Sequence, residues 1–494
     1  MLEITLGPER WIYVIVLFGN DHEHYAPMLT AFGKTRAIAL LYFTRLPGRE
    51  MSYEAQSPTK MNRCNKPRSA ASCPVCWLLL SALFLIAIRG SAATGATPST
   101  WWKGNLHTHS LWSDGDDYPE MIVEWYKLHG YQFLALSDHN VLAQGSKWID
   151  ATTNKGGAVA LEKYLKRYGT NRVHLRETNG RRQVRLKTFP EYREQFEEPG
   201  RFLLIQNEEI TDKYKSKPIH VNATNLRDLI EPQGGNSVRE VIQNNVNAVF
   251  EQHRRTGRPM FPHLNHPNFD WGVTAEDLMP VKNERFFEVY NGHPLVHNEG
   301  DDTHASTDRL WDIILTMRLT DYNDGAVYAL GVDDSHNYHT LSSSKSNPGR
   351  GWVVVRATRL TTANIVAAME AGDFYASSGV RLKDVRRGMD RYEIEIAPEE
   401  GVTYTTQFIG TRRGFDRSSK PLLDEKGEPL LVTRQYSKEI GQVLAEVTGP
   451  AANYTLKGDE IYVRARTISS KLKANPYVKG EFERAWTQPL VPNR

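Results

Sequence analysis

The sequence predicts an α/β protein in which a barrel of alternating strands and helices is followed by a small antiparallel β-sandwich. Seven short apolar runs, each ending in polar residues, occur between residues 104 and 336, as expected for buried parallel strands. Helix-like segments separate several of these runs, which favours helices packed outside a parallel sheet. Beyond about residue 380 the pattern becomes period-two and β-rich, which is typical of a sandwich.

The predicted barrel strands share an apolar body and a polar carboxyl end. They are GNLHTH (104–109), FLALSDHN (133–140), RFLLIQNEEIT (201–211), IHVNATNL (219–226), MFPHLNHPN (260–268), FFEVYNG (286–292) and VYALGVDDSH (327–336). Seven strands of this kind, interleaved with helices, predict a barrel.

Helix signals lie between these runs. Pro119 opens one helix and Gly130 ends it. Ser237 followed by Glu240 forms a capping-box pattern for a second helix, which ends by Gly257. The predicted helices cover 119–128, 237–257, 307–318 and 362–371. Residues 145–200 form an irregular, polar insertion.

Composition sets the broad class of the protein. A chain of 494 residues has room for two or three domains, and we place a barrel domain at 101–380 and a sandwich domain at 381–494. With 40% hydrophobic and 24% charged residues, it has the composition of a soluble globular protein. The net charge of +3 argues against a dedicated polyanion binder, so no nucleic-acid partner is expected. The oligomeric state stays open.

A candidate targeting segment precedes the predicted barrel. Residues 61–96 combine a basic head, an apolar run over 76–88 and small residues at 91–93, the layout of a secretory signal peptide. We therefore expect a periplasmic or extracellular protein. An uncleaved anchor is the second choice, since a membrane span needs about 20 apolar residues. Residues 1–60 are expected to be a non-native or disordered extension.

The insertion carries a local excess of positive charge. Between Lys163 and Lys187 nine Lys or Arg residues accompany the single acid Glu177. Two interpretations stay open: a solvated insertion, or a lip that steers anions.

Histidines are concentrated in the predicted barrel. All fourteen histidines outside the leader fall between His107 and His339. Several imidazoles and carboxylates lie at or just beyond the ends of separate strands: His107, His109, His139, Glu209, His220, His266, Asp334 and His336. In a parallel barrel these ends meet on one face, where catalytic groups collect. Asp114 lies in the loop after the first strand.

Neutral imidazole and carboxylate are the preferred ligands of zinc, manganese and iron. About nine such groups exceed what one ion coordinates, so the sequence predicts two or three divalent ions. The three cysteines, at 64, 73 and 76, all precede the barrel, so thiolate ligands are not expected.

The motifs also resemble a known family. HTHSLWSDG, ALSDHN, EEIT followed by HVNA, HPN, EVYNG and GVDDSH are similar, in this order, to the motifs of the PHP (polymerase and histidinol phosphatase) superfamily. The resemblance covers residues 104 to about 380. It implies a distorted seven-stranded (βα) barrel with a di- or trinuclear metal centre.

Transferring the family pattern implies three metal sites that share side chains. The first ion would be held by His107, His109, Glu209 and Asp334. The second would share Glu209 and use His220 and His266. The third would use Asp114, His139 and His336. Three assignments have competitors: Glu208 precedes Glu209, His263 competes with His266, and Asp114 stands where some relatives have histidine.

Such a site is suited to hydrolysis, because metal ions lower the pKa of a bound water and stabilise negative charge in the transition state. The leading hypothesis is a secreted phosphoesterase that uses a metal-bound hydroxide on a small-molecule ester, with no membrane span after signal cleavage. Asp138, His304 or a bound water could protonate the leaving group. Asn291 and His263 are the candidate substrate contacts.

Two alternatives use the same barrel. The leader and a C-terminal domain ending in AWTQP (485–489) also resemble carbaryl-hydrolase-like enzymes, which cleave carbamate or amide-type bonds. A non-catalytic, metal-containing binding protein is the other alternative.

Overall fold

A computed structural model describes residues 2–5, 11–18, 38–43 and 99–492. The chain divides into two compact units, Met1–Ala92 and Ala93–Arg494. In the first unit, β1 (Leu2–Thr5), β2 (Trp11–Phe18) and β3 (Ile38–Phe43) form one sheet in that order. These strands fall where the sequence predicted a non-native or disordered extension, whereas the predicted signal peptide at 61–96 lies outside the described residues. Among the described residues, no helix is long and apolar enough to span a bilayer.

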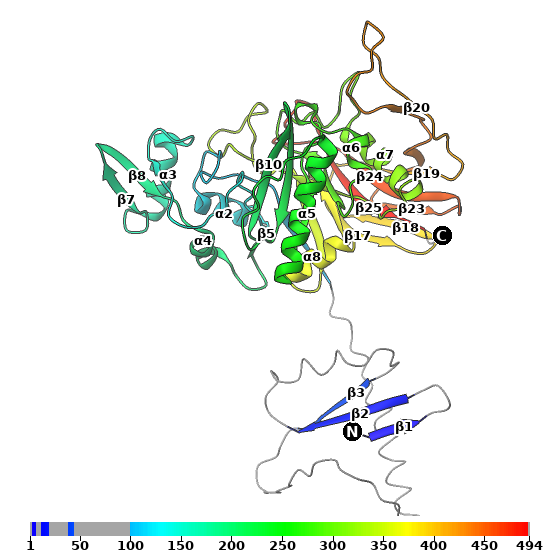
Figure 1. Cartoon of the computed structure of the whole chain (residues 1–494), viewed down its shortest axis with the longest axis horizontal. Coiled ribbons are helices and arrows are strands. Elements are labelled where there is room, and N and C mark those ends of the chain that lie inside the picture. The colour runs from blue at the N-terminus through cyan, green and yellow to red at the C-terminus, as the bar shows by residue number, and fades with distance from the viewer. Residues whose placement is uncertain (1, 6–10, 19–37, 44–98, 493–494) are drawn as a thin grey trace, which may run out of the picture. The chain divides into compact units, whose positions relative to one another are not determined.

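The second unit is a mixed α/β structure (Figure 1). Its helices are α2 (Pro119–Leu128), α3 (Gly157–Tyr168), α4 (Phe189–Phe196), α5 (Val238–Thr256), α6 (Ala275–Leu278), α7 (Thr307–Thr320) and α8 (Thr362–Glu370). A 3-10 turn covers Phe269–Trp271. The four helices predicted from the sequence correspond to α2, α5, α7 and α8.

Local signals explain where these helices start and stop. Pro119 opens α2, and Gly130 follows its end with a positive φ of 75°. The Ser237 hydroxyl accepts the backbone N–H of Glu240 at the start of α5. The Glu240 carboxylate instead accepts the N–H of Asn236, so the predicted capping box is only half formed. Gly257 ends α5 in the left-handed conformation.

One five-stranded sheet carries the middle of the unit. Its order is β10 (Asn207–Tyr214), β11 (Lys217–Thr224), β12 (Phe261–Leu264), β13 (Phe286–Asn291) and β14 (Tyr328–Val332). The last three strands run parallel, as predicted, but β11 is antiparallel to both β10 and β12. The reason is local: only residues 215–216 separate β10 from β11, and Lys215 takes a φ of 55°. A parallel neighbour would need a crossover of a dozen or more residues.

A nine-stranded sheet joins the two halves of the unit. Its order is β22 (Gln442–Thr448), β19 (Tyr404–Arg412), β24 (Glu460–Leu472), β25 (Phe482–Leu490), β16 (Phe374–Ser377), β15 (Trp352–Ala357), β4 (Thr100–Asn105), β5 (Phe133–Leu134) and β9 (Leu203–Leu204). Because β25 pairs with β16, and β15 with β4, strands from 381–494 continue the sheet that begins the predicted barrel.

The closed seven-stranded barrel is therefore not confirmed, since its strands are divided between two open sheets. A third sheet, β17 (Leu382–Arg387), β18 (Arg391–Ile396) and β23 (Ala451–Thr455), shares a buried core with the nine-stranded sheet. Tyr392 and Phe408 lie in that core, so the C-terminal part has the two-layer packing of a sandwich but shares one of its layers with the rest of the unit.

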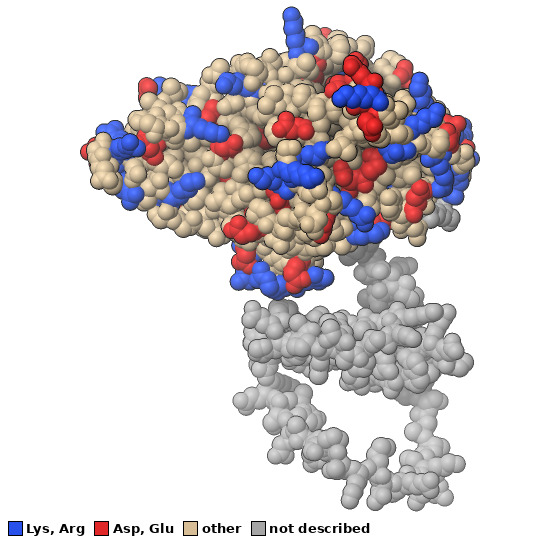
Figure 2. All heavy atoms as spheres, turned by 45° about the horizontal axis from the view of Figure 1, so that its top comes forward, with Lys and Arg blue, Asp and Glu red and all other residues tan. Residues whose placement is uncertain are grey.

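The predicted insertion at 145–200 forms α3, α4 and a small sheet. That sheet consists of β6 (Trp148–Asp150), β8 (Arg181–Arg185) and β7 (Leu175–Thr178). Outside the insertion, β20 (Ser419–Lys420) and β21 (Gln435–Tyr436) form a separate two-stranded sheet. Asn179 and Gly180 both have positive φ, at 54° and 70°, as a two-residue hairpin turn requires. On the face shown in Figure 2, charges of both signs are interspersed.

Candidate metal centre

The imidazoles and carboxylates predicted as metal ligands meet where the two large sheets touch. His107 and His109 follow β4, and His139 follows β5, all on the nine-stranded sheet; Glu209 and His220 belong to the five-stranded sheet. Two isolated β-bridges join the sheets at this point, Thr108 to Ser335 and His139 to Glu209. The strand ends therefore converge as they would in a barrel, although neither sheet closes.

Four buried side chains form the first group. The His107 Nε2 atom lies 3.1 Å from His109 Nε2, 3.4 Å from Glu209 Oε2 and 3.3 Å from Asp334 Oδ1. The His109 Nε2 atom lies 3.2 Å from each of the same two oxygens. Ligand atoms at about 2.0–2.1 Å from a tetrahedral ion are separated by about 3.3 Å. The spacing of His107, His109 and Glu209 fits one divalent ion, and Asp334 lies at similar distances from both imidazoles.

Glu209 links this group to a second one. Its other oxygen, Oε1, lies 2.8 Å from His220 Nδ1 and 3.4 Å from His266 Nε2. Asn265 also donates a hydrogen bond of 2.7 Å to this Oε1 atom. The carboxylate of Glu209 thus faces two sets of imidazoles with different oxygens, as a bridging ligand must.

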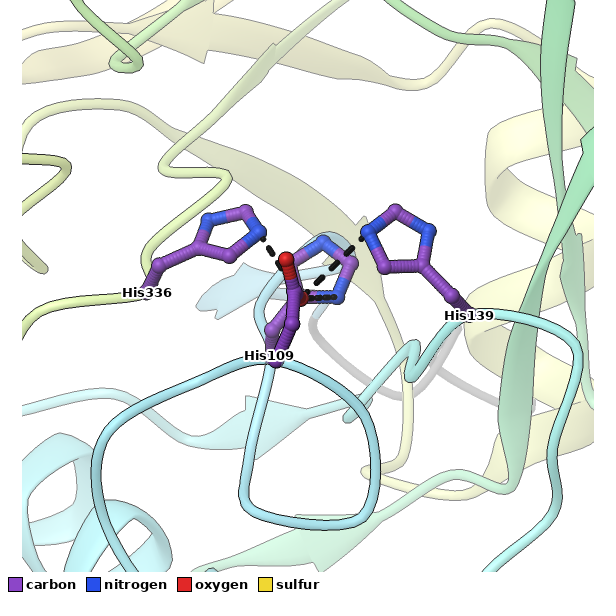
Figure 3. Close-up of side chains that lie close together, drawn as sticks. His109, His139 and His336 are labelled. Atoms are coloured by element: carbon purple, nitrogen blue, oxygen red, sulfur yellow. Dashed lines mark ion pairs between the residues drawn. The ribbon is translucent and has the colours of Figure 1, made fainter. Parts of the chain in front are cut away.

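His109, His139 and His336 lie close together in the third group (Figure 3), which Asp114 completes. The Asp114 Oδ1 atom lies 3.2 Å from His336 Nε2, 3.4 Å from His139 Nε2 and 3.8 Å from His109 Nδ1. The predicted trio of Asp114, His139 and His336 is thus brought together, with the second nitrogen of His109 facing it. These atoms all lie within 4.8 Å of one another.

The electrostatics of these groups require positive charge among the buried carboxylates. Burial opposes ionisation of Glu209, but the charges of His139 and His107 outweigh it and hold its pKa well below 4.5. Burial likewise lowers the pKa of His107, but Asp334, Glu288 and Glu209 raise it well above 6.5. Buried carboxylates that stay ionised need positive charge beside them. Protons on the imidazoles or metal ions among them supply that charge.

Two buried atoms point to the same conclusion. His109 Nδ1 and Glu209 Oε2 are shielded from solvent and have no hydrogen-bond partner of good geometry. Such atoms are rare in folded proteins and call for an explanation such as an ion. Both belong to the groups just described, so the residues present fit a metal centre.

Neighbouring acids have different roles at residues 333 and 334. Asp333 is fully buried and accepts the backbone N–H groups of Arg350 and Gly351 at 2.6 and 2.8 Å. Asp334 has a positive φ of 48°, which is strained for a residue other than glycine. The anchored Asp333 and this backbone conformation turn Asp334 toward His107 and His109.

Glu288 supports the ligands and was missed by the sequence analysis. Glu288 lies in the middle of β13 and contacts His107 Nδ1 at 2.6 Å. The other ring nitrogen of His107, Nε2, faces Asp334. Glu288 also accepts the backbone N–H of His266 at 2.8 Å. A carboxylate behind a histidine fixes its tautomer and orientation. The lone acid in the apolar strand FFEVYN was the available signal.

The two predicted substrate contacts lie behind the ligands. Asn291 is fully buried and donates to Glu288 Oε2 at 2.8 Å and to Asp334 Oδ2 at 3.1 Å. His263 is also fully buried, with its Nε2 atom 3.3 Å from Glu288 Oε1. Neither residue lines the pocket described below. Asn291 thus contacts the candidate ligand Asp334, and His263 contacts Glu288 beside the candidate ligand His107.

The two proposed proton donors also lie outside this pocket. The Asp138 carboxylate accepts hydrogen bonds from the backbone and hydroxyl groups of Ser110 and Ser113 at 2.7–3.1 Å. It organises the loop after β4. The His304 ring stacks on Trp271 at 3.8 Å and contacts Asp301 at 2.8 Å.

The three groups open on one pocket of about 490 Å³. Besides six of the predicted ligands, its walls contain Asp116, Lys155, Phe269, His293, Leu295 and Asn337. Among the histidines in the loop after β13, His293 lines it, whereas His297 and His304 do not. The pKa of His293 falls to about 4, because it is buried beside other imidazoles. The pocket is wide enough for a small molecule.

The comparisons with known proteins give only a weak structural likeness. No protein-family profile and no curated protein matches the chain. Similar solved structures include a two-domain protein containing a predicted PHP-like metal-dependent phosphoesterase from Bacteroides vulgatus ATCC 8482, and an inferred metal-dependent phosphoesterase from Bifidobacterium adolescentis ATCC 15703. The first has 15% identity and a TM-score of 0.34, covering 77% of this chain and 93% of its own. The second has 12% identity and a TM-score of 0.23, covering 47% and 87%. At these values the likeness carries no argument about fold or function.

Proposed function

We propose that this chain is a metal-dependent hydrolase of the PHP type that acts on small phosphoesters. One observation carries the proposal: three groups of imidazoles and carboxylates, linked through Glu209 and His109, open on a single pocket. The motif order in the sequence, which resembles the PHP superfamily, agrees with this geometry. Two or three divalent ions, zinc, manganese or iron, match the donor set.

The proposed ligands fall into three sets, one for each ion. His107, His109, Glu209 and Asp334 would hold one ion, His220 and His266 a second with Glu209, and Asp114, His139 and His336 a third. Bound ions supply a water of lowered pKa and positive charge for the developing anion. Glu288 and Asn291 keep the ligands in place. Their buried positions shield the ligand bonds from solvent on the side away from the pocket.

Neighbouring glutamates on β10 provide a matched test. Glu209 faces the imidazoles, whereas Glu208 points to the other face of the strand and accepts the N–H of Ile230 at 3.1 Å. The full chain, loaded with manganese or zinc, should release p-nitrophenol from p-nitrophenyl phosphate. Glu209→Gln should reduce this rate and the bound metal by at least about 100-fold, since it removes a bridging ligand. Glu208→Gln should retain both.

Two outcomes would contradict the proposal. Full metal occupancy without turnover of phosphoesters, carbamates or amides would favour a binding protein. Equal loss of activity in both glutamate variants would show that Glu209 has no special role.

We also propose that residues 61–96 direct the chain out of the cytoplasm. The basic head and apolar run in the sequence support this. Cell fractionation should recover the protein in the periplasm or medium, without the leader. Retention in the cytoplasm at full length would contradict it.

A further inference from the structure

The pocket over the metal groups contains one side chain with a fixed positive charge. Of the described residues that line it, Lys155 alone is a lysine or arginine. The Nζ atom of Lys155 lies 3.2 Å from Asp114 Oδ2, the oxygen of Asp114 turned away from the histidines. The Lys155 side chain is 59% exposed. Since an ammonium has three donors, it can donate to a further partner in the pocket.

A turn that is fixed by side-chain hydrogen bonds holds Lys155 at this position. Asn154 Oδ1 accepts the backbone N–H groups of Gly156 and Gly157 at 2.9 and 3.0 Å. Asp150 Oδ1 accepts those of Thr152 and Thr153, both at 2.9 Å. These side-chain bonds fix the backbone on both sides of residue 155. The lysine therefore extends from an ordered turn of the insertion.

The turn is docked against the loop that carries Asp114. A β-carbon at Gly156 would lie 2.1 Å from the carbonyl oxygen of Asp116 and 2.5 Å from the Ala160 β-carbon. Only glycine permits this approach of the two backbones. The insertion thus presents Lys155 to the pocket at a fixed place.

Stability does not explain this placement. A partly exposed pair such as Lys155 and Asp114 contributes little to folding. The Asp114 carboxylate lies between the ammonium and the histidines and screens it from ions bound there. The same position is favourable when an anionic ligand binds the ions and accepts a hydrogen bond from Lys155.

We infer that Lys155 binds an anionic oxygen of the substrate, and that the pocket selects a phosphate monoester over a neutral carbamate. This inference rests on the proposed hydrolase function and narrows its substrate class. The phosphoryl group has free charged oxygens for both the ions and the ammonium. A neutral carbamate offers no charged oxygen to Lys155. The anion-steering role considered for residues 163–187 is here assigned to Lys155, outside that range.

Binding of inorganic phosphate to the metal-loaded full chain tests the inference without turnover. Isothermal titration should show phosphate bound about tenfold more weakly by Lys155→Ala than by the unchanged protein, the effect of losing one charge-assisted hydrogen bond. Lys155→Arg should restore most of the affinity, because the charge is kept. Lys166→Ala is the matched control, since Lys166 is an exposed lysine of the same insertion outside the pocket.

Kinetics and metal content complete the test. For p-nitrophenyl phosphate, Lys155→Ala should raise KM, whereas any hydrolysis of a neutral p-nitrophenyl carbamate should be unchanged. Unchanged phosphate affinity in Lys155→Ala, with turnover intact, would overturn the inference and leave the hydrolase standing. A parallel loss of metal would also overturn it, because Lys155 would then act through Asp114. Lys155-dependent phosphate binding without turnover of any ester would keep the anion site and refute the hydrolase.

Discussion

His107 Nδ1 lies 2.6 Å from Glu288 Oε1, and both side chains are fully buried. The opposite ring nitrogen of His107 faces Glu209 and Asp334. Glu288 thus determines which nitrogen of His107 is free to bind a cation. Such a carboxylate influences metal affinity without touching the metal.

Glu288→Gln should weaken metal binding by about 10–100-fold, the usual effect of losing a carboxylate behind a histidine ligand. Competition with a chromogenic chelator measures this affinity. Glu284→Gln is the matched control, because Glu284 is equally buried just before β13 and its pKa of about 8 keeps it neutral. Equal affinities in the two variants would show that Glu288 does not orient His107.

Glu208→Gln should stabilise the protein increasingly as pH rises. Burial raises the pKa of Glu208 from 4.5 to about 8. Between these values the unfolded chain loses the proton while the folded chain keeps it, so wild-type stability falls with rising pH. Because glutamine does not ionise, the variant does not lose stability in this way. Its free energy of unfolding should exceed that of the wild type by on the order of 4 kcal/mol at pH 8.

Urea unfolding at pH 4, 6 and 8 measures this difference. It should be small at pH 4, where the glutamate is mostly protonated in both states. Glu400→Gln, at an exposed position, should show no such trend. A stability difference between Glu208→Gln and the wild type that does not change with pH would show that the pKa of Glu208 is not raised in the folded protein.

Gly156→Ala should destabilise the fold by about 1–3 kcal/mol, as overpacking does. The added carbon would meet the backbone of Asp116, while the Gly156 φ of −79° suits any residue. Gly325→Ala is the control, since nothing lies within 4 Å of its β-carbon position. Equal stability of the two variants in urea unfolding would show that the insertion is not held as described.

Asp312→Ala should cost about 3 kcal/mol and lower the stability of the whole second unit. Asp312 on α7 pairs with the buried Arg464 of β24 at 2.7 Å, and losing one partner of a buried pair leaves an uncompensated charge. Arg464 keeps a contact with Asp308 at 2.9 Å, which limits the loss. Glu395→Ala, from the exposed cluster around Arg386, should have little effect.

This prediction also tests the shared sheet. Far-ultraviolet circular dichroism and tryptophan fluorescence should report one unfolding transition for residues 99–492, shifted as a whole by Asp312→Ala. Separate transitions, with only one affected, would show that the C-terminal strands fold independently.

The sequence by itself determined the order of the candidate ligands along the chain and the main helices. Strand ends marked by His107, His139 and Asp334 were readable because buried strands are short apolar runs that stop at polar residues. Pro119 and Ser237 marked the starts of α2 and α5 because caps and prolines act locally. These signals depend only on residues close together in the chain.

Only the tertiary structure decided between adjacent candidates and between sheet arrangements. Glu208 and Glu209 are chemically identical, and strand alternation alone places the second beside the imidazoles. β10 and β11 likewise form an antiparallel hairpin, and β25 pairs with β16. Open sheets therefore replace the expected barrel. Pairing partners, and supports such as Glu288 and Lys155, lie far apart in the chain, so no local pattern specifies them.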